Sequence, residues 1–347
     1  MNILFTGKTD FNYNRVRVLI AGLRKLKDVS LTVFPIDSRR NFDKKKFAEL
    51  QEKADFIYIP PFRHRDVTFI RKQTKKPIVF DPLISKYLTK DDFGHFWKLP
   101  FKYFLDKIPF SACDVLLADT NCHKQYFSSQ FNIPLSKVHV LPIGVDTDLF
   151  YQRADKKVKS ADHIFRVGFY GSFVPLQGTE KIMMAAHELA SHQDIRFEII
   201  GSGYRLKQAK DLVKKWKITN VNFQGMLQYD QLNEKINEFD ICLGIFGDSD
   251  KANFVVPNKI YHYASVAKCV LTKETVGIKE IFTDNENIVL CNATPTDIAK
   301  AIIDLKNNSK KIERIAQAGH KLITEEYNEI ETAKRFIKII NNAGIKS

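Results

Sequence analysis

The chain has 347 residues, which suggests two domains at roughly 100–200 residues each. Hydrophobic residues make up 44% and charged residues 27%, a composition that excludes wholesale disorder. Lys and Arg number 54 against 40 Asp and Glu, a net charge of +14. This excess indicates an anionic partner, which is nucleic acid, a phosphorylated small molecule or an anionic membrane surface.

The cysteines and the N-terminus bear on the compartment. The 5 cysteines form no CxxC pair, which argues against a disulfide scaffold or a zinc ribbon and favours a reducing compartment. The first residues read as a strand and a loop, without the apolar segment of a signal peptide. No stretch approaches the roughly 18 apolar residues of a membrane-spanning helix. The sequence therefore predicts a cytoplasmic protein.

Along residues 1–150, short apolar segments that end in Gly, Pro or Asp alternate with amphipathic ones. Six segments predict strands: NILFTG, VSLTVFPI, DFIYIP, PIVFDP, DVLLAD and VHVLPIG. The segments RVRVLIAGLRKL and KKKFAELQEKA have helical periodicity. This alternation predicts a parallel sheet covered by helices on both faces.

The same pattern starts again in the second half, after the polar stretch YQRADKKVKSADH, which is the predicted linker. Six further segments predict strands: FRVGFYGS, RFEIIGSG, VNFQG, ICLGIFG, KCVLT and NIVLC. EKIMMAAHELASH predicts a helix, and TEEYNEIETAKRFIKIINNAG predicts a long last helix. The expected fold is α/β, with two Rossmann-like doubly wound parallel-sheet domains facing across a cleft. Ligands then bind beyond the carboxyl ends of the strands.

Three short motifs are set aside. GKT at residues 7–9 lacks the upstream glycine of a phosphate-binding P-loop. His187 and His192 are five residues apart, which places them on different sides of a helix. DSD at residues 248–250 resembles a metal-binding motif, but acidic pairs are common in loops. The sequence therefore predicts no metal site.

The segment GFYGSFVPLQGTEKIMMAAHEL, residues 168–189, predicts a strand, a loop from Gly171 to Gly178 and a helix from about Thr179. Glycines let backbone amides approach a ligand closely, and a helix N-terminus carries partial positive charge. The segment is equally well interpreted as a diphosphate-binding loop and as a plain strand-to-helix connection.

The segment LGIFGDSDKANFVVPNKIYHYASVAKCVLTKET, residues 243–275, adds two lysines. The predicted strand ends at Phe246, Lys251 lies in the loop, and Pro257 starts the helix that carries Lys259. A cation beside the strand ends would offset the charge of a departing diphosphate. The alternative for each lysine is a solvated surface position.

On these segments, and on CDVLLADTNCHKQYFSSQFNIPLSKVHVLPIGVDTDLF at residues 113–150, the sequence resembles the GT-B glycosyltransferases of the group 1 (family 4) type. The resemblance covers nearly the whole chain. It implies retaining transfer of a sugar from a nucleotide-diphosphate-sugar to a glycan or lipid-linked glycan, without a metal or other cofactor, in cell-surface polysaccharide or glycoconjugate synthesis. It also implies an acceptor domain over 1–155, joined by a last helix at about 325–347, and a donor domain over 161–324.

The chain departs from the family pattern at its charged positions. The family's Arg and Lys of the first glycine loop fall near Ser172 and Gln177, and its two glutamates fall near Phe254 and on His262. The resemblance therefore suggests that lysines supply the lost cations and that His262 binds a ribose hydroxyl. The alternative for His262 is a helix-surface residue. Glu280 matches a family position near the donor, or it caps a helix.

The first domain offers polar residues at its predicted strand ends. Asp81 follows PIVF, where the family contacts the transferred sugar or the acceptor, although it also suits a turn before proline. Asp119 and His123 follow the next strand, and Asp119 would also suit a helix N-cap. The loop after the first strand would face the acceptor.

These interpretations define three predicted sets of residues. The catalytic set is Asp81, Lys251 and Lys259. The donor-binding set is Gly171, Ser172, Gln177, Gly178, Gly201, Phe246, Pro257, Asn258, His262 and Glu280. The acceptor-binding set is Gly7, Lys8, Asp10, Asp119 and His123.

Two features suggest a membrane surface as partner. Residues 93–110, FGHFWKLPFKYFLDKIPF, interleave aromatic residues with three lysines, although an internal helix is the favoured interpretation. The basic segments SRRNFDKKK and FRHRDVTFIRKQTKK are the stronger signal, because residues 1–150 carry 25 Lys and Arg against 16 Asp and Glu, a net of +9. A peripheral position on the cytoplasmic face of a membrane is therefore considered.

Other functions stay open at this point. One is a nucleotide-sugar epimerase on the same fold. Another is a non-catalytic sugar-nucleotide or glycan-binding partner protein, since the glutamate pair is missing. Nucleic-acid binding is disfavoured because the sequence contains no RNP motif, zinc-finger spacing or basic repeat.

Overall fold

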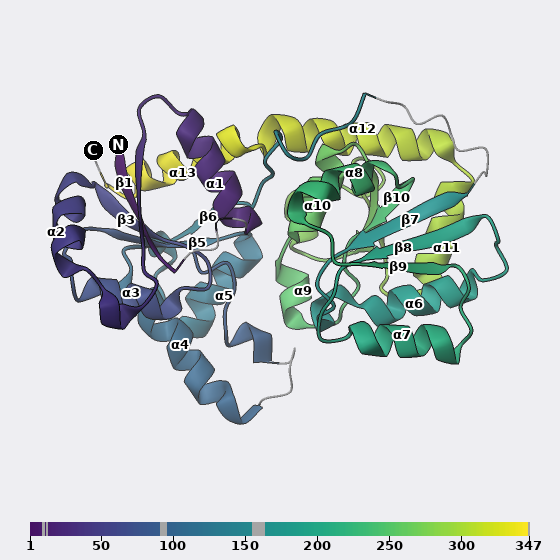
Figure 1. Cartoon of the computed structure of the whole chain (residues 1–347), viewed down its shortest axis with the longest axis horizontal. Coiled ribbons are helices and arrows are strands. Elements are labelled where there is room, and N and C mark those ends of the chain that lie inside the picture. The colour runs from purple at the N-terminus through teal and green to yellow at the C-terminus, as the bar shows by residue number, and fades with distance from the viewer. Residues whose placement is uncertain (9–10, 12, 91–95, 155–163, 346–347) are drawn as a thin grey trace. The chain divides into compact units, whose positions relative to one another are not determined.

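The computed structural model describes residues 1–8, 11, 13–90, 96–154 and 164–345. The chain divides into two compact units, of which unit 1 comprises Met1–Asp146 with Tyr327–Ser347, and unit 2 comprises Thr147–Glu326. Residues 147–154, which the sequence assigned to the first domain, thus belong to unit 2. Figure 1 shows a sheet covered by helices in each unit.

All six strands that the sequence predicts in the first half are present in unit 1. They form one parallel sheet in the order β2-β1-β3-β4-β5-β6. The strands are β1 (Asn2–Gly7), β2 (Ser30–Pro35), β3 (Phe56–Ile59), β4 (Ile78–Phe80), β5 (Val115–Ala118) and β6 (Val138–Val140). The helices are α1 (Asn14–Lys25), α2 (Lys44–Lys53), α3 (His64–Arg71), α4 (Leu99–Ala112), α5 (Asn121–Phe131) and α13 (Glu329–Asn342), with short 3₁₀ turns η1 (Arg39–Asn41), η2 (Leu88–Lys90), η3 (Phe96–Lys98) and η4 (Leu135–Lys137).

Successive side chains along the strands of unit 1 point to opposite faces of the sheet, and both faces are apolar. Leu4 joins the core beneath α2, α3, α4 and α5, whereas its neighbours Ile3 and Phe5 join the core beneath α1 and α13. Phe336 of α13 packs against Tyr58 of β3 with ring centroids 5.6 Å apart. The backbone of α13 comes so close to α1 that a Cβ on Gly22 would lie 1.8 Å from the Glu329 carbonyl oxygen. The C-terminal helix is therefore an integral layer of unit 1.

The six strands predicted in the second half form the sheet of unit 2, in the order β12-β11-β10-β7-β8-β9. The strands are β7 (Phe165–Tyr170), β8 (Ile195–Ile200), β9 (Val221–Gly225), β10 (Ile241–Leu243), β11 (Cys269–Lys273) and β12 (Val289–Cys291). The helices are α6 (Thr179–Glu188), α7 (Leu206–Lys215), α8 (Leu232–Asn237), α9 (Asp250–Phe254), α10 (Asn258–Ser265), α11 (Pro295–Lys306) and α12 (Ser309–Glu326), with 3₁₀ turns η5 (Pro175–Gln177), η6 (Tyr229–Gln231) and η7 (Ile278–Glu280).

The structure differs from the sequence-based expectation in two segments. The predicted last helix is interrupted, because α12 ends at Glu326 and Asn328 caps α13 by accepting a hydrogen bond from the Glu331 amide at 2.9 Å. The predicted linker is only partly described, since 155–163 lie outside the described residues. Its first residues pack on α8, where the Tyr151 amide donates to Asn233 Oδ1 at 3.1 Å.

Candidate functional site

The strand order of unit 2 identifies where a ligand would bind. The chain moves from β7 to β8 and β9 on one side of the sheet, and then returns to place β10 on the other side of β7. Neighbouring parallel strands whose connections run in opposite directions leave a crevice beyond their carboxyl ends. The loops after β7 and β10, which carry Gly171–Gly178 and Phe246–Lys251, therefore meet at the topological switch point.

Hydrogen bonds join these two loops. The amides of Phe246 and Gly247 donate to the carbonyl oxygens of Gln177 and Leu176 at 3.1 and 3.2 Å. Gly178 adopts φ +63°, and a Cβ there would lie 2.4 Å from the Phe246 carbonyl carbon. A glycine is therefore required for both the backbone conformation and the close approach. The glycines seen in the sequence thus let the loops Gly171–Gly178 and Phe246–Lys251 pack closely at the switch point, and we call these two loops the floor of the site.

Lys259, in the first turn of α10, reaches into this floor. Its side chain is only 3% exposed. The Nζ atom donates a hydrogen bond to Gln177 Oε1 and lies 3.7 Å from the ring centroid of Phe169. A Cβ on Gly171 would lie 2.8 Å from that Nζ, so the missing side chain of Gly171 leaves the space for the ammonium group. The alternative of a solvated surface lysine is wrong for Lys259.

The electrostatics around Lys259 are unusual for a cation. Burial lowers its pKa well below the usual value for lysine. Its hydrogen-bond acceptor is a neutral amide, and the face of an aromatic ring supplies further but modest stabilisation. A negatively charged ligand at this edge of the sheet would compensate the buried charge.

Further cations surround the same edge, and sequence reasoning missed three of them. Lys181 and Lys273 both pair with Asp248, at 2.6 and 3.8 Å. Arg205, in the loop after β8, pairs with Glu180 of α6 at 2.7 Å. Each lies next to a strand end or in the first turn of α6. That placement after a predicted strand is the feature of the sequence that could have identified them.

The predicted residue Lys251 lies on α9, which contacts η5. Its neighbour Ala252 packs against Leu176 of that turn. Lys251 is partly exposed, unlike Lys259. The structure thus places both predicted lysines at the carboxyl edge of the sheet, one buried in its floor and one beside it.

His262 lies in the interior of unit 2 rather than on a helix surface. It is 1% exposed and stacks on Phe150, with ring centroids 3.8 Å apart. Tyr170 Oη contacts its Nδ1 at 2.5 Å, and Tyr229 Oη contacts its Nε2 at 3.3 Å. Burial lowers the pKa of His262 to about 3, so the imidazole is neutral near pH 7. Its assignment to a ribose hydroxyl stays a prediction, and it would require a tyrosine to move.

Two predicted backbone donors are already engaged. The Gly171 amide donates to the Ile200 carbonyl at 3.0 Å, and the Gly178 amide donates to the Pro175 carbonyl at 3.1 Å. These two amides do not face a ligand in this conformation. The amides of Thr179 and Glu180 lie in the first turn of α6, where helix geometry supplies no acceptor within the helix.

The other predicted donor residues divide by burial. Phe246 is fully buried in the core of unit 2, so only its backbone borders the switch point. The helix-capping alternative for Glu280 is wrong, because Glu280 ends η7 and the Thr275 hydroxyl accepts from the Ile278 amide instead. The remaining residues lie at or beside strand ends and the α10 N-terminus: exposed Ser172, buried Gly201, and partly exposed Pro257 and Asn258.

In unit 1, Asp81 follows β4 as predicted but is 1% exposed. Its Oδ2 accepts hydrogen bonds from Arg15 Nε at 2.6 Å and from Tyr58 Oη at 2.9 Å. Arg15 Nη1 also donates to the carbonyl oxygens of Leu141 and Pro142, at 2.8 and 2.6 Å. The structure gives Asp81 a buried ion pair that joins α1 to the sheet, and its catalytic assignment stays a prediction.

Asp119 and His123 form a second buried pair at the end of β5. His123 Nδ1 lies 2.7 Å from Asp119 Oδ1, and the two side chains are 1% and 3% exposed. The N-cap alternative for Asp119 is wrong, because the Thr120 hydroxyl accepts from the His123 amide. Among the described residues, Asp119 Oδ2 and His123 Nε2 are buried atoms without a hydrogen-bond partner. Both atoms therefore remain able to bind a polar group.

The rest of the predicted acceptor set is only partly described. Gly7 ends β1, and Lys8 is exposed, with its amide 3.5 Å from Asp66 Oδ2. Asp10 lies outside the described residues. A Cβ on Gly7 would lie 3.2 Å from the Pro60 ring, so the ends of β1 and β3 approach closely at the switch point of unit 1.

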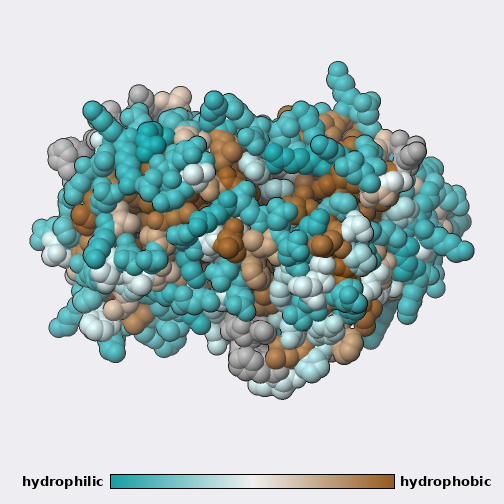
Figure 2. All heavy atoms as spheres, turned by 180° about the vertical axis from the view of Figure 1, so that it is seen from behind, coloured by the Kyte–Doolittle hydropathy of each residue, from teal (hydrophilic) through white to brown (hydrophobic). Residues whose placement is uncertain are grey.

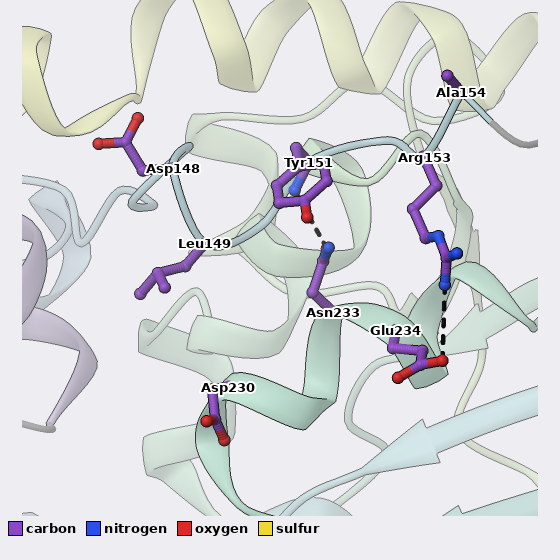
Figure 3. A pocket seen from close by; sticks show the side chains of 8 residues that line it. All are labelled: Asp148, Leu149, Tyr151, Arg153, Ala154, Asp230, Asn233 and Glu234. Atoms are coloured by element: carbon purple, nitrogen blue, oxygen red, sulfur yellow. Dashed lines mark hydrogen bonds and ion pairs between the residues drawn. The ribbon is translucent and has the colours of Figure 1, made fainter.

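Unit 2 also has an open groove of about 640 Å³ away from the predicted site residues. Figure 3 shows the segment with Tyr151 and Arg153 on one side and Asn233 and Glu234 of α8 on the other. Arg153 Nη1 and Glu234 Oε1 are 3.6 Å apart, which makes this a screened surface pair. The groove contains none of the predicted donor residues.

The described residues contain neither a metal-binding cluster nor a membrane-spanning helix. Over the part of the chain that the structure describes, no group of three or more His, Cys, Asp or Glu side chains is arranged to hold a metal ion. None of the described helices is both long and apolar enough to span a bilayer.

Comparisons with known proteins bear on both units. Residues 181–338 match a family described as glycosyl transferase-like. No curated protein matches the chain. Among solved structures, HepE of Anabaena, in complex with UDP and glucose, has a TM-score of 0.76 at 12% identity, covering 98% of this chain and 99% of that one.

Two further structures are similar over the full length. Sucrose-phosphate synthase of Thermosynechococcus elongatus has a TM-score of 0.79 at 11% identity and covers 100% of both chains. A glycosyltransferase of Rickettsia africae has a TM-score of 0.71 at 14% identity, covering 100% of this chain and 99% of that one. At such identities the likeness establishes the fold, and the two six-stranded parallel sheets confirm the predicted α/β class.

Proposed function

We propose that the chain is a GT-B glycosyltransferase of the group 1 type, and that it transfers a hexosyl group from a nucleotide-diphosphate-sugar bound by unit 2. The observation that carries this proposal is Lys259, a buried cation without an acidic hydrogen-bond partner, seated where Gly171 leaves it space at the switch point. A diphosphate is the ligand that would compensate such a charge.

The roles of the donor residues follow from their positions. Lys259 would contact the diphosphate, and the first amides of α6 would complete the cradle with the partial positive charge of the helix N-terminus. Arg205 neutralises Glu180 of that helix, which otherwise would repel a phosphate. Lys251 would add a second cation from the neighbouring loop. Two lysines and one arginine would thus replace the family's Arg and Lys, which are absent from the glycine loop.

The proposed chemistry is a substitution at the anomeric carbon of the donor. The bond from that carbon to the diphosphate oxygen breaks, and the electron pair leaves with the diphosphate. A bond to an acceptor hydroxyl oxygen forms, and the proton of that hydroxyl passes to the departing diphosphate. Cations aimed at the developing charge lower the barrier for such a step. Retention of configuration and transfer without a metal are part of the proposal because the sequence resemblance implies them.

The acceptor is proposed to be a glycan or a lipid-linked glycan, in the synthesis of a cell-surface polysaccharide or glycoconjugate. The net charge of +9 over residues 1–150 supports an anionic acceptor, or an anionic membrane that presents it to unit 1. HepE was solved with UDP-glucose, and a mutant of TarM of S. aureus was solved with fondaparinux, alpha-GlcNAc-glycerol and UDP, which supports a nucleotide-sugar donor by analogy only.

Thermal unfolding with UDP, GDP, ADP and their glucose conjugates tests the donor site. A ligand at a hundred times its dissociation constant adds about 2.7 kcal/mol to stability, so at least one nucleotide should raise the melting temperature by several degrees. Lys259→Met should abolish that rise. Lys207→Met, which removes an exposed ion-paired lysine on α7, is the matched control and should retain it.

Either of two results would refute the donor assignment: no stabilisation by any nucleotide at millimolar concentration, or equal stabilisation of the wild type and Lys259→Met. Chromatography of the products with and without acceptor glycans then tests turnover. A changed sugar from donor alone would identify an epimerase. Binding without turnover would identify the non-catalytic alternative, which the enclosed His262 in place of a glutamate favours.

A further inference from the structure

Helix α4 of unit 1 has one face in the core. Phe110 packs with Phe127 at a ring-centroid distance of 4.8 Å. Asp106, the single acidic residue of the helix, is 0% exposed. It accepts hydrogen bonds from the Ser85 hydroxyl at 2.7 Å and from the amides of Lys86 and Tyr87 at 3.0 and 2.8 Å. These contacts fix the helix and leave no acidic charge on its outer side.

The opposite side of α4, with η3 before it, exposes large apolar residues. Trp97, Phe101, Phe104 and Ile108 are 73%, 56%, 55% and 53% exposed. Their spacing of four, three and four residues places the helical members on one side of α4. We call these four residues the α4 stripe. The favoured sequence interpretation of an internal helix is therefore correct for only one side of α4. Residues 93–95 of that segment lie outside the described residues.

The other exposed large apolar side chains do not form such a row. They are spread over both units, and exposed apolar residues of this kind are common on soluble proteins: Phe11, Leu135, Tyr151, Tyr204, Trp216, Met226 and Val276. In Figure 1 the N-terminal part of α4 projects away from the sheet of unit 1. Figure 2 shows brown and pale side chains gathered at that projection. A contiguous exposed apolar surface of this kind indicates a binding surface.

Among the described residues, the exposed and partly exposed charges of η3, α4 and α3 beside the α4 stripe are positive. Lys98 is exposed, and Lys102 and Lys107 of α4 are partly exposed. Arg65, exposed on the neighbouring α3, places its guanidinium carbon 5.9 Å from the ring centroid of Phe101. With Asp106 buried, every exposed charged residue of α4 is a cation. Aromatic side chains interleaved with cations are complementary to the interface of an anionic bilayer.

We propose that the α4 stripe docks unit 1 on the surface of an anionic lipid bilayer. The aromatic side chains would enter the interface, while Lys98 and Arg65 would contact the headgroups. The 14-residue helix is too short to span a bilayer, so it would lie at the surface. The docking itself does not depend on the proposed function. Its biological purpose, which is to bring unit 1 to a lipid-linked acceptor, rests on that function.

Vesicle sedimentation of the full chain, without nucleotide or acceptor, tests the docking. Wild-type protein should bind vesicles of phosphatidylcholine with about a third phosphatidylglycerol, and high salt should weaken that binding. Phe101→Ser with Phe104→Ser should lower the partition coefficient at least about tenfold, because two apolar side chains no longer leave water. Leu135→Ser with Met226→Ser removes two exposed apolar residues elsewhere and should bind as the wild type.

The controls separate docking from folding and from donor binding. Both double variants should keep the wild-type melting temperature and the wild-type response to nucleotides, because the altered side chains are exposed and none of them belongs to the predicted donor set. Loss of the nucleotide response in wild type, with vesicle binding intact, would refute the proposed function and leave the docking supported.

Three outcomes would overturn the docking proposal. The first is equal vesicle binding by the wild type and the Phe101→Ser, Phe104→Ser variant. The second is equal binding to neutral and anionic vesicles. The third is a wild-type dimer in size-exclusion chromatography that the same variant converts to a monomer, without vesicle binding, because the stripe would then be covered by a second copy of the chain.

Discussion

Among the described residues, each unit buries one arginine or lysine at the carboxyl edge of its sheet, and the two cations have different surroundings. Arg15 of unit 1 is 1% exposed and pairs with Asp81 at 2.6 Å. Lys259 of unit 2 is 3% exposed and donates to the neutral amide of Gln177. Burial opposes both charges and is the largest single influence on Arg15, but Asp81, Tyr58 and Asp119 together outweigh it and raise the pKa of Arg15. Nothing comparable offsets burial at Lys259, whose pKa is lowered well below its usual value.

The difference separates a structural charge from one suited to a ligand. Arg15 has its counter-ion within unit 1, along with two carbonyl acceptors, so folding alone satisfies most of its hydrogen-bonding capacity. Lys259 has a neutral amide and an aromatic face beside it, and neither is a counter-ion. A buried cation without a counter-ion costs stability, and such costs are concentrated at functional sites.

The largest expected effect comes from removing the counter-ion of Arg15. Asp81→Asn keeps the shape of the side chain but leaves a buried, unpaired guanidinium, and it should lower the free energy of unfolding by about 3–5 kcal/mol. Urea denaturation followed by circular dichroism measures the loss. Replacing both partners, with Arg15→Met and Asp81→Leu, should cost less than the single change. A loss below about 1 kcal/mol for Asp81→Asn would show that the Arg15–Asp81 ion pair does not stabilise unit 1 appreciably.

A smaller effect of opposite sign is expected for Lys259. Lys259→Met without ligand should stabilise the protein by roughly 1–3 kcal/mol at pH 7, because an uncompensated polar group leaves the interior. Because its folded-state pKa is depressed, the unfolded state binds more protons between that pKa and about 10.5, so wild-type stability rises with pH there. The advantage of the variant should therefore shrink towards pH 10. If Lys259→Met instead destabilised the ligand-free protein at pH 7, the buried charge of Lys259 would not be costing stability.

At pH 7 the smallest effect is expected for His262, a buried base that carries no charge there, and its effect grows only as the pH falls. Its folded-state pKa of about 3 lies below the usual value of 6.5, so the unfolded state binds more protons between these limits. Stability should be complete above pH 6.5 and fall as the pH drops towards 3, by up to about 1.4 kcal/mol per pH unit.

The matched variant for this test is His262→Gln, whose amide can still hydrogen-bond Tyr170 and Tyr229 but does not titrate. Urea denaturation at pH 7, 6, 5 and 4 should show a shallower decline for His262→Gln than for the wild type. His192→Gln, at an exposed position after α6, is the control and should follow the wild type. Parallel declines of wild type and His262→Gln would mean that His262 is not a proton-linked group.

Much of the fold was predictable because its signals are local. All twelve predicted strands are present, since each contains a short apolar segment and most end in or beside a Gly, Pro or Asp. The loop from Gly171 to Gly178 was identified for the same reason. The interruption at Asn328 was missed because the apolar periodicity continues across it, and only the cap and the return of α13 to unit 1 reveal the break.

The candidate site was predictable in position but not in the state of its side chains. Lys259 and His262 were placed near the donor loops from the sequence, where a surface position was an equal or favoured alternative for each. The structure buries both residues. Arg205 and Lys273 were missed because single basic residues after strands are common, and only the sheet order brings them to the same edge.

By itself, the sequence determined the two α/β units, the switch-point loops and a net charge of +14 concentrated in residues 1–150. Only the tertiary structure decided which charges are compensated. Arg15 meets Asp81 across 66 residues of sequence, and Lys259 meets the neutral Gln177 across 82. Asp106 is buried on the side of α4 opposite the α4 stripe. The physical reason is that periodicity and turn residues act over a few positions, whereas burial and charge pairing depend on contacts between distant segments of the chain.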